Sequence, residues 1–490
     1  MNHSIRNRRA GRWAAAAGAA ALALVGAVAA AAPAMAATPY DLPDGPGSLT
    51  IHKFEQPSPA GAANDSGEPI DTTGLVALGN VEFTVYPITD IDLTTEAGWD
   101  LANDYAADPS LATALGTPIV LTTAADGSTP TQSLPNGAYL VVETDSSGAT
   151  LPDGSPANVI LEAAPFVVTV PVPLGNGEWN SDVNVYPKNS LTQVAKTVDD
   201  PDGSGLGSTV TWSIEATVPA LPDGESFTEF HFVDTLDGRL EYTAPARLTL
   251  DGTPLTFTET HVGADAEGLG GTVTVTLDAA SLAALEAAPG GSLVLELDTI
   301  VRGTGDIPNT GTVFINEPTT GNGTDTNTVN TYWGAVEILK HAEGDVNAVL
   351  TGAVFSVYPT EADANAGTNA IVVDGETTFT TAADGTVVIP GLWAGADAAG
   401  SVTYYLKELE APDGYITSGT PIAVVVSAAS LATPVEVAVP NPQEPAISLP
   451  LTGGNGTLVL MSAGVGLVAL AVGLAVLAAR RRRHADATLS

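Results

Sequence analysis

The chain has 490 residues, and its 56 acidic side chains outnumber the 16 lysines and arginines, which gives a formal net charge of -40 at pH 7. This charge excludes nucleic acid as a partner, because a polyanion would be repelled. The chain contains no cysteine, so disulfide bonds cannot stabilise the fold.

The first 36 residues predict a secretory signal peptide. Four arginines precede an apolar run, residues 13–32, and the run is followed by Ala34-Met35-Ala36, whose small residues suit a cleavage site. We therefore expect the mature chain to begin near Ala37, outside the cytoplasm. The chain that follows is long enough for about three domains of ~140 residues each.

Beyond Ala37, apolar and polar residues alternate over short runs that Gly, Pro, Asn and Asp separate. This pattern predicts antiparallel strands of β-sandwiches with one face buried. The clearest runs are residues 49–55, 81–86, 139–143, 166–170 and 183–186. Residues 281–288 are rich in alanine and predict one short helix, as the main exception to an all-β chain.

Two parts of the chain repeat one series of strand motifs. Residues 49–53 and 139–143 begin and end the first series, and residues 336–340 and 404–408 begin and end the second. The first and third domains are therefore predicted to be of one type, with a different domain between them. The fold class that we expect is all-β, with three tandem Ig-like β-sandwich domains at residues 37–188, 189–331 and 332–446.

Between the signal peptide and residue 453 the chain has five lysines, too few to serve solubility: Lys53, Lys188, Lys196, Lys340 and Lys407. Four of them lie in recognisable contexts, and Lys407 looks incidental. In the third domain Lys340 lies on the first predicted strand, Glu408 on a middle strand and Asn441 on the last strand. Because the first and last strands of such a sandwich can be neighbours, Lys340 and Asn441 could meet.

A buried set of lysine, acid and asparagine has a specific chemistry. Desolvation lowers the pKa of Lys340 and exposes a neutral nucleophile, while a buried, protonated Glu408 can polarise the amide of Asn441 and relay protons. The product is an isopeptide bond formed with loss of ammonia, and one turnover per molecule is sufficient. The alternative is an ordinary cross-strand ion pair between Lys340 and Glu408.

The residues around Glu408 resemble the E-box of Gram-positive pilins with collagen-adhesin B-type domains. The matching positions are Tyr404, Leu406, Glu408, Ala411, Pro412, Gly414 and Tyr415. Leu409 departs from the family, which usually has threonine there, and this leaves the role of Glu408 intact. The resemblance implies that the first and third domains are CnaB-like and that the middle domain is the CnaA-like second domain of fimbrial subunits.

In the second domain of that family an aspartate replaces the glutamate as proton relay. Lys196 and Asp234 match these positions, with Asn309 as the first choice of acceptor because it opens a predicted strand. Asn316, which closes the same strand, is the alternative acceptor. A solvated surface lysine is the alternative interpretation of Lys196.

The first domain offers a weaker set. Lys53 and Glu143 occupy the positions equivalent to Lys340 and Glu408, and Asn189 or Asn184 could be the acceptor. Glu143 lacks the Ala-Pro-x-Gly-Tyr sequence that follows Glu408, so an internal bond is expected less here than in the other two domains.

The end of the first domain resembles the pilin motif of shaft subunits. The matching residues are Trp179, Val183, Val185, Tyr186, Pro187, Lys188 and Asn189. Pro187 ends a strand, so the Lys188 side chain should project at a sheet edge or interdomain groove where an enzyme can reach it. The resemblance implies that Lys188 of one subunit attacks a thioester made from Thr452 of the next. The alternative interpretation is that Lys188 is exposed only because it lies at a domain junction.

The C-terminal segment resembles the LPXTG sorting signal of Gram-positive surface proteins. The predicted sorting motif, residues 447–453, contains Leu449, Pro450, Leu451, Thr452 and Gly453. It precedes an uncharged stretch, residues 454–479, that is long enough to cross a bilayer, and a tail, residues 480–490, that begins with four arginines. This order holds the bond between Thr452 and Gly453 just outside the membrane, where a sortase cuts it.

Together these resemblances imply the major shaft subunit of a covalently polymerised fimbria, similar to the type 1 and type 2 fimbrial subunits of actinobacteria. Its partners would be identical subunits, pilin-specific and housekeeping sortases, a tip or minor pilin, peptidoglycan, and an unknown host or bacterial surface ligand. The alternative is a monomeric wall-anchored adhesin in which Lys188 is inert. A pull between Lys188 and Thr452 would load the middle and third domains, so the first domain is expected to lie off the load path.

No motif of a multiple-turnover enzyme occurs. The sequence has no HExxH, no Cys/His cluster and no phosphate-binding loop, so no cofactor and no metal are expected. The acidic residues 199–203 superficially suggest calcium, but a proline interrupts them and no glutamate follows at EF-hand spacing.

Overall fold

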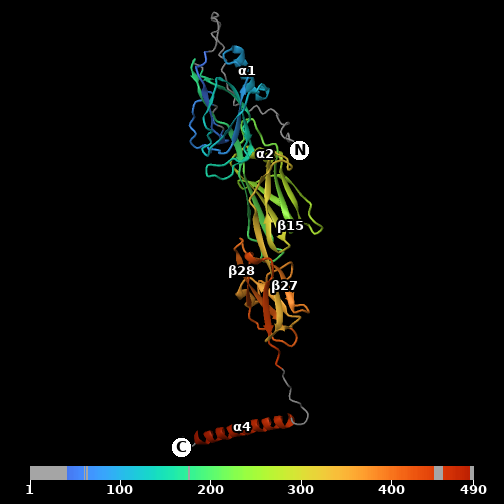
Figure 1. The fold of residues 1–490 in the computed structure, drawn as a ribbon. Coiled ribbons are helices and arrows are strands. Elements are labelled where there is room, and N and C mark those ends of the chain that lie inside the picture. Colours follow the sequence, from blue (N-terminus) through green and yellow to red (C-terminus); the bar gives the residue numbers. More distant parts are fainter. Residues whose placement is uncertain (1–40, 60, 62–63, 175–176, 446–455, 486–490) are drawn as a thin grey trace.

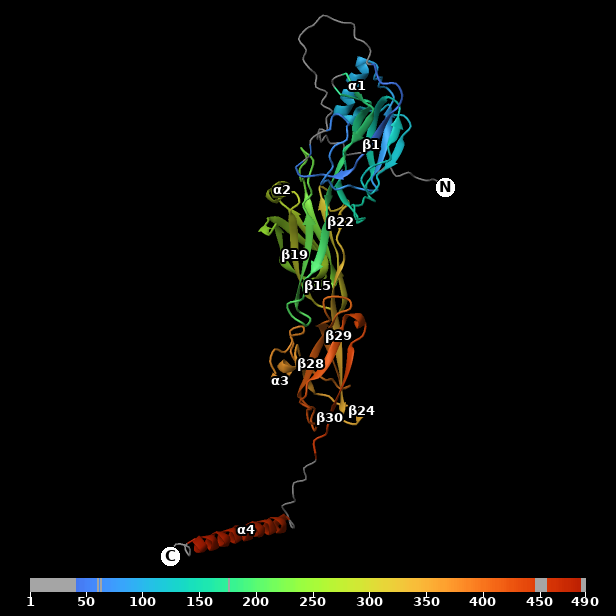
Figure 2. The same cartoon turned by 90° about the vertical axis from the view of Figure 1, so that its left-hand side faces the viewer.

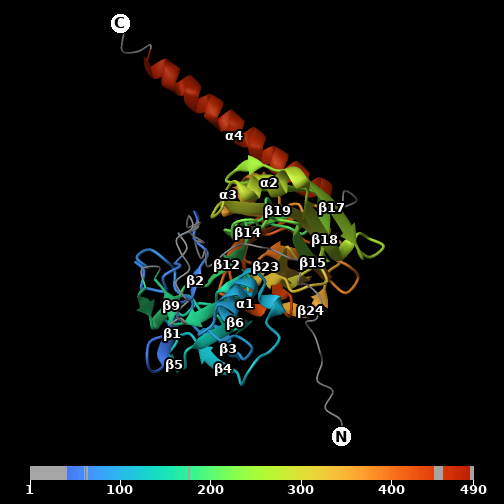
Figure 3. The same cartoon turned by 90° about the horizontal axis from the view of Figure 1, so that it is seen from above.

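The computed structural model describes residues 41–59, 61, 64–174, 177–445 and 456–485, and the predicted signal peptide and sorting motif lie outside these residues. Three β-domains follow one another end to end in chain order (Figures 1 and 2). In the view from above, the first domain lies to one side of the other two (Figure 3). The all-β prediction is confirmed for the described chain.

The first domain is a sandwich with a small extra layer. One sheet has the order β4 (Ile119–Thr122), β3 (Glu82–Ile88), β6 (Gly137–Asp145) and β8 (Phe166–Val170). The opposing strands are β11 (Asp182–Val185), β1 (Gly47–Ile51) and β5 (Gln132–Leu134), followed by β2 (Phe54–Glu55), β12 (Lys188–Thr192) and β7 (Asn158–Leu161). A two-stranded pair, β9 (Val172–Pro173) and β10 (Trp179–Asn180), completes it. Alternate apolar residues such as Leu49, Phe83 and Val141 meet between the sheets.

Helix α1 (Glu96–Ala107) was not predicted, and it is followed by the 3-10 turn η1 (Pro109–Leu111). Thr95 caps α1 by accepting a hydrogen bond from the Gly98 amide, as N-cap threonines do. Trp99, Ala102 and Tyr105 recur on one face, and they cover the outer surface of the β6–β8 sheet. The buried face of the helix includes the small residues Gly98 and Ala102 beside Trp99 and Tyr105, so its apolar periodicity is weak in the sequence.

The middle domain is built on longer strands. Its main sheet has the order β13 (Val194–Val198), β14 (Thr209–Thr217), β19 (Ser292–Val301), β15 (Phe230–Leu250), β18 (Leu269–Leu277) and β17 (Phe257–Val262). Strands β16 (Thr253–Pro254), β21 (Gly311–Ile315) and β22 (Thr324–Asp325) attach to it, and β20 (Gly305–Asn309) pairs with the next domain's first strand. The alanine-rich helix is confirmed as α2 (Ala279–Glu286).

The third domain again has two sheets. The first contains β23 (Val329–Ala342), β24 (Asp345–Val349), β27 (Thr386–Trp393) and β30 (Val435–Asn441), and the second has the order β26 (Phe379–Thr380), β25 (Val354–Tyr358), β28 (Ser401–Glu410) and β29 (Ile422–Ser427). Two short elements join the strands, α3 (Glu361–Ala366) and η2 (Ala428–Ser430).

First and last strands pair in parallel in both outer domains, where the sequence predicted antiparallel strands. Strand β1 pairs with β11 and β2 with β12, while β23 pairs with β30 over seven residues. The remaining ladders of these domains are antiparallel. Alternation of apolar residues reports burial and not strand direction, so the pattern could not distinguish the two.

The middle and third domains share one strand and one apolar core. Strand β23 pairs through its first residues with β20 and through its later residues with β27 and β30. A segment of the middle domain, residues 204–206, lies against the third domain; we call it the strap. The Leu206 side chain is buried there, and a single apolar cluster runs through both domains.

Candidate functional site

Three lysines are fully buried, one in each domain. Lys53, Lys196 and Lys340 have exposed fractions of 0%, 2% and 0%. Lysine is almost never fully buried unless its charge is paired, so each of these amines needs a partner. In every case the structure places a carboxylate beside the amine.

In the first domain, Lys53, Glu143 and Asn189 form one hydrogen-bonded group. Lys53 Nζ lies 2.7 Å from Glu143 Oε2 and 2.5 Å from Asn189 Oδ1, and Asn189 Nδ2 donates to Glu143 Oε1 at 2.6 Å. Burial lowers the pKa of Lys53 to about 8, against the opposing effect of the Glu143 carboxylate. The alternative acceptor, Asn184, is instead paired with the His52 ring at 3.0 Å.

Strand pairing explains why Asn189 reaches Lys53. Lys53 lies between β1 and β2, and β12, which carries Asn189, runs parallel to β2 with Asn189 opposite Glu55. Glu143 comes from β6 of the facing sheet. The structure therefore assembles this set although the sequence after Glu143 lacks the E-box.

In the middle domain, Lys196 Nζ donates to Asp234 Oδ2 with both side chains buried. Desolvation lowers the pKa of Lys196 and raises that of Asp234, and each charge partly offsets the effect on the other. Asn309 is buried nearby, and its amide lowers the pKa of Asp234, although it makes no hydrogen bond of normal geometry to a described residue.

The structure distinguishes between the two candidate acceptors of the middle domain, Asn309 and Asn316. The sequence predicted that Asn309 opens a strand, but the structure places it at the end of β20. The next strand, β21, begins at Gly311, which faces Asp234 across the β15–β21 ladder. Asn316 follows β21 at its other end, where it accepts from Thr228 N at 2.8 Å. Asn316 therefore does not reach Lys196.

Sequence reasoning missed two neighbours of Lys196. Asn327 accepts a hydrogen bond from the Lys196 amide at 2.8 Å and donates to its carbonyl at 2.9 Å, which fixes the backbone of β13. Gly311 makes room for Ile214 beside the amine, because a Cβ there would lie 2.4 Å from Ile214 Cδ1, whereas 3.7 Å from Lys196 Nζ is an ordinary contact distance. Neither residue type signals such a role in a sequence.

In the third domain, Lys340 lies on β23, Glu408 on β28 and Asn441 at the end of β30. Lys340 Nζ donates to the Val439 carbonyl at 2.9 Å and lies 3.6 Å from Glu408 Oε1, which accepts from Asn441 Nδ2 at 2.7 Å. Desolvation lowers the pKa of Lys340. The predicted contact between the first and last strands is confirmed, with Ala342 opposite Asn441 in the parallel ladder.

Each of the three groups can support transfer of an acyl group from asparagine to lysine. The lowered pKa makes a neutral amine accessible, and the acid can take the amine proton and deliver one to the leaving nitrogen. Placement of the groups in one buried site of the folded domain replaces the concentration that such a reaction would need in water.

Lys188 differs from the buried lysines. It begins β12 and is half-buried, and desolvation lowers its pKa. Its side-chain amine has no hydrogen bond or ion pair to any described residue. Tyr186, two residues earlier, stacks with the rings of His52 and Phe54, at centroid distances of 4.9 and 6.4 Å.

Lys407 looked incidental from its sequence context, but its amine has defined partners in the structure. Its Nζ donates to the carbonyls of Ala364 and Asn365 at 2.7 and 3.1 Å, at the C-terminal end of α3. A cation at this position is favourable because the last carbonyls of a helix lack partners. Lys188 is therefore the one lysine without a polar partner in the part of the chain that the structure describes.

Beyond the third domain, Thr452 and the rest of the predicted sorting motif lie outside the described residues. Helix α4 (Gly456–Ala485) contains an apolar stretch, Met461–Ala479, with a mean hydropathy of 2.3, long enough to cross a membrane. The described residues contain no cluster of metal-ligating side chains.

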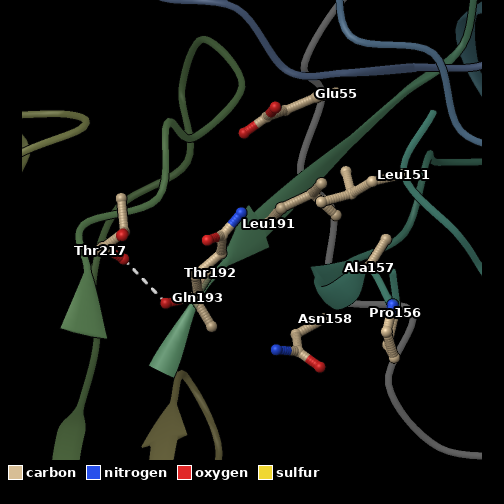
Figure 4. A pocket seen from close by; sticks show the side chains of 9 residues that line it. All are labelled: Glu55, Leu151, Pro156, Ala157, Asn158, Leu191, Thr192, Gln193 and Thr217. Carbon is tan, nitrogen blue, oxygen red and sulfur yellow. Dashed lines mark hydrogen bonds between the residues drawn. The ribbon is translucent and has the colours of Figure 1, made fainter. Parts of the chain in front are cut away.

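A small cavity of about 190 Å³ lies between the first and middle domains (Figure 4). Its lining residues are Glu55, Leu151, Pro156, Ala157, Asn158, Leu191, Thr192, Gln193 and Thr217. It contains a single ionisable side chain, so it offers no catalytic group of its own.

Comparisons with known proteins cover both outer domains and the C-terminal segment by family models, and most of the chain by full-length relatives. Residues 45–190 match the N-terminal domain D1 of Gram-positive pilin subunits, residues 334–439 a prealbumin-like fold domain and residues 441–486 the LPXTG cell wall anchor motif. The chain is 33% identical to a type 2 fimbrial subunit of Actinomyces naeslundii, over 91% of each chain, and 32% identical to a type 1 fimbrial subunit of Actinomyces viscosus, over 98% of this chain and 99% of that one.

A solved structure shares the fold. The full-length major pilin SpaD from Corynebacterium diphtheriae superposes with a TM-score of 0.66 at 24% identity, over 83% of this chain and 100% of that one.

Proposed function

This chain belongs to the family of Gram-positive fimbrial subunits that end in an LPXTG cell wall anchor, and from that premise we propose that it forms the fimbrial shaft by head-to-tail linkage of Lys188 to Thr452. It is a cell-wall-anchored surface protein. The single observation that carries the proposal is the state of Lys188, which is half-buried and has no polar partner among the described residues, while the other four lysines are engaged.

The linkage requires a sortase as catalyst. A pilin-specific sortase would cut after Thr452 and pass the acyl group to Lys188 of another subunit, and a housekeeping sortase would pass the finished fibre to peptidoglycan. Because desolvation lowers the pKa of Lys188, more of its amine is neutral at a given pH than for a free lysine, which favours attack on the thioester. A tip or minor pilin and an adhesion ligand would complete the assembly.

We further propose that all three domains carry an internal isopeptide bond. The pairs are Lys53 with Asn189, Lys196 with Asn309 and Lys340 with Asn441, with Glu143, Asp234 and Glu408 as the proton relays. The first-domain bond was expected least from the sequence, and its three side chains make the most complete hydrogen-bonded set. The relatives are structural subunits, so these single-turnover reactions are the chemistry that we assign to the chain.

Polymerisation is tested by the Lys188→Ala variant in the native strain. Cell-wall extracts should show a ladder of SDS-resistant polymers that Lys188→Ala collapses to monomer, because the acceptor amine is gone. The matched control is Lys407→Ala, which removes a lysine that caps a helix and should leave the ladder intact. A single monomeric band from the unmutated strain would instead indicate the alternative, a monomeric wall-anchored adhesin.

The internal bonds are tested by the intact mass of the recombinant mature chain. We expect a mass lower than that of the sequence by three ammonia molecules, one for each domain. Glu408→Ala should restore one ammonia by blocking the third-domain bond alone. A parent mass without any ammonia loss would refute the crosslinks.

A further inference from the structure

The first-domain group has a backbone donor that the other two groups lack. Ala163 N–H donates to Asn189 Oδ1 at 2.8 Å and, less closely, to Glu143 Oε2 at 3.1 Å. In the other two domains the corresponding oxygens, Asn309 Oδ1 and Asn441 Oδ1, have no hydrogen-bond partner among the described residues.

The network fixes the orientation of the Asn189 amide. A backbone N–H can only donate, so the amide atom that faces Ala163 must be the oxygen, and the Nδ2 group then points to the Glu143 carboxylate. The carbonyl oxygen and the leaving nitrogen are therefore held by different groups, one by the backbone and one by the acid.

We propose that the backbone N–H of Ala163 is an oxyanion donor for the bond between Lys53 and Asn189. This inference rests on the proposed internal bond of the first domain. When the neutral Nζ of Lys53 attacks Cγ of Asn189, negative charge develops on Oδ1, where the Ala163 N–H already points. A preorganised donor of this kind stabilises the transition state without reorganisation.

The step balances without any external reagent. The bond between Nζ and Cγ forms, and the bond between Cγ and Nδ2 breaks. Glu143 takes one proton from Nζ and delivers one to Nδ2, so that nitrogen leaves as ammonia and the carboxyl group ends as it began. The Ala163 N–H keeps its proton throughout and stabilises charge on Oδ1 only while the tetrahedral intermediate exists.

The position of Ala163 is anchored on both sides. It lies in the connection between β7 and β8, and the preceding Glu162 accepts a hydrogen bond from Ser146 Oγ at 2.8 Å. Pro165 follows two residues later, with its backbone angle φ fixed by the ring. The donor is therefore preorganised before Lys53 reacts.

The test removes the N–H alone. Cell-free synthesis of the mature chain with lactic acid in place of Ala163 converts that amide to an ester, which keeps the shape and lacks the donor. The same ester at Ala164, an exposed neighbour, is the matched control. The rate of loss of ammonia from the Lys53–Asn189 peptide is followed by mass spectrometry, and Ala163→Pro and Ala163→Gly provide variants without and with the N–H.

We expect slower formation of the first-domain bond, with an unchanged midpoint of the pH–rate profile. Removal of one oxyanion donor should slow the first-domain bond by about 100-fold, while the ester at Ala164 and Ala163→Gly react at the parental rate. The midpoint of the pH–rate profile should stay near the Lys53 pKa of about 8, because the donor acts on Oδ1 and not on the amine. The bonds of the other domains, in the same molecules, should be unaffected.

Two results would overturn the inference. One is a parental rate in the ester at Ala163. The other is a fall in rate with a midpoint moved towards the ordinary lysine pKa, which would mean that the site had opened and that Ala163 only holds the structure. Failure of the proposed internal bond itself is distinguishable, because the unmutated chain would then retain the first-domain ammonia, and both ideas would fall.

Discussion

Lys196 and Asp234 face each other inside the middle domain, with side-chain exposures of 0% and 1%. The amine also lies 5.8 Å from the centre of the Trp212 ring. Removal of one partner from a buried ion pair typically costs about 3–5 kcal/mol, whereas replacement of the pair by apolar groups is tolerated. Before the bond forms, the pair is therefore a poor source of stability, and its value lies in the reaction that it permits.

Substitutions of the two residues can separate the loss of the isopeptide bond from the cost of burying an unpaired charge. Lys196→Met and Asp234→Ala both abolish the middle-domain bond, but only Asp234→Ala leaves an unpaired buried amine. Lys196→Met leaves an unpaired buried carboxylate instead, so the suitable reference is the double variant that removes both charges. We expect Asp234→Ala to be less stable than Lys196→Met/Asp234→Ala by about 3–5 kcal/mol in urea unfolding at pH 7. The deficit should shrink as the pH rises, because the amine then becomes neutral.

The double variant Lys196→Met/Asp234→Ala is the control for this prediction. It should recover most of the stability that Asp234→Ala loses, since no charged amine remains. Equal unfolding midpoints for Asp234→Ala and the double variant would contradict the argument.

At the scale of elements, the strap and β23 join the middle and third domains. Leu206 N donates to the Gly391 carbonyl at 3.2 Å, and the amides of Asp374 and Trp393 donate to carbonyls of the strap at 2.6 and 2.9 Å. Arg302 adds an ion pair to Asp374 at 3.2 Å. With β23 continuous across the junction, the two domains should move as one body.

A substitution at Gly391 tests this junction, because the absence of a side chain there makes room for Leu206. A Cβ at Gly391 would lie 2.6 Å from Leu206 Cγ, so Gly391→Ala should displace the strap. We expect faster hydrogen exchange at the amides of Asp374 and Trp393, with no change at amides in the first domain. Gly238→Ala is the matched control, since a Cβ there meets nothing within 4 Å. Unchanged exchange in Gly391→Ala would mean that the strap does not hold the junction.

The acids, the lysines and Asn441 could be predicted as members of the candidate sites because residue type and spacing indicate their chemistry. It could not predict the roles of Asn327 or of the Ala163 N–H, since one clamps a backbone and the other is a group that every residue except proline carries. Helix α1 was missed because its buried face holds few large residues. Parallel pairing of first and last strands was missed because it arises from tertiary topology.

At the scale of the molecule, a pull on Lys188 enters at the first residue of β12. That strand pairs with β2 and β7, so the pull would peel it from the first domain unless Asn189 is tied to Lys53. With Lys188 as the proposed linkage point, part of the first domain would share the load, whereas the sequence predicted that this domain lies off the load path. Its crosslink would lie one residue beyond the point where the force enters.

In the middle and third domains the proposed bonds carry the load directly. Force that passes from Lys196 to Asn309 through an isopeptide bond bypasses the 112 residues 197–308, and the bond from Lys340 to Asn441 bypasses the 100 residues 341–440. A bypassed segment cannot extend, because its two ends are held together.

Single-molecule pulling measures these bypassed lengths. The chain has no cysteine, so Lys188→Cys and a cysteine added after Pro445 give two unique handles. Relative to this parent, Lys196→Met should gain about 400 Å of extension and Lys340→Met about 350 Å, at ~3.5 Å per released residue. Lys53→Met should gain no comparable length, because residues 53–187 lie outside the handles. Equal extension of the parent and Lys196→Met would show that no covalent bond shields the middle domain, since only a bond can hold its ends together after the strands separate.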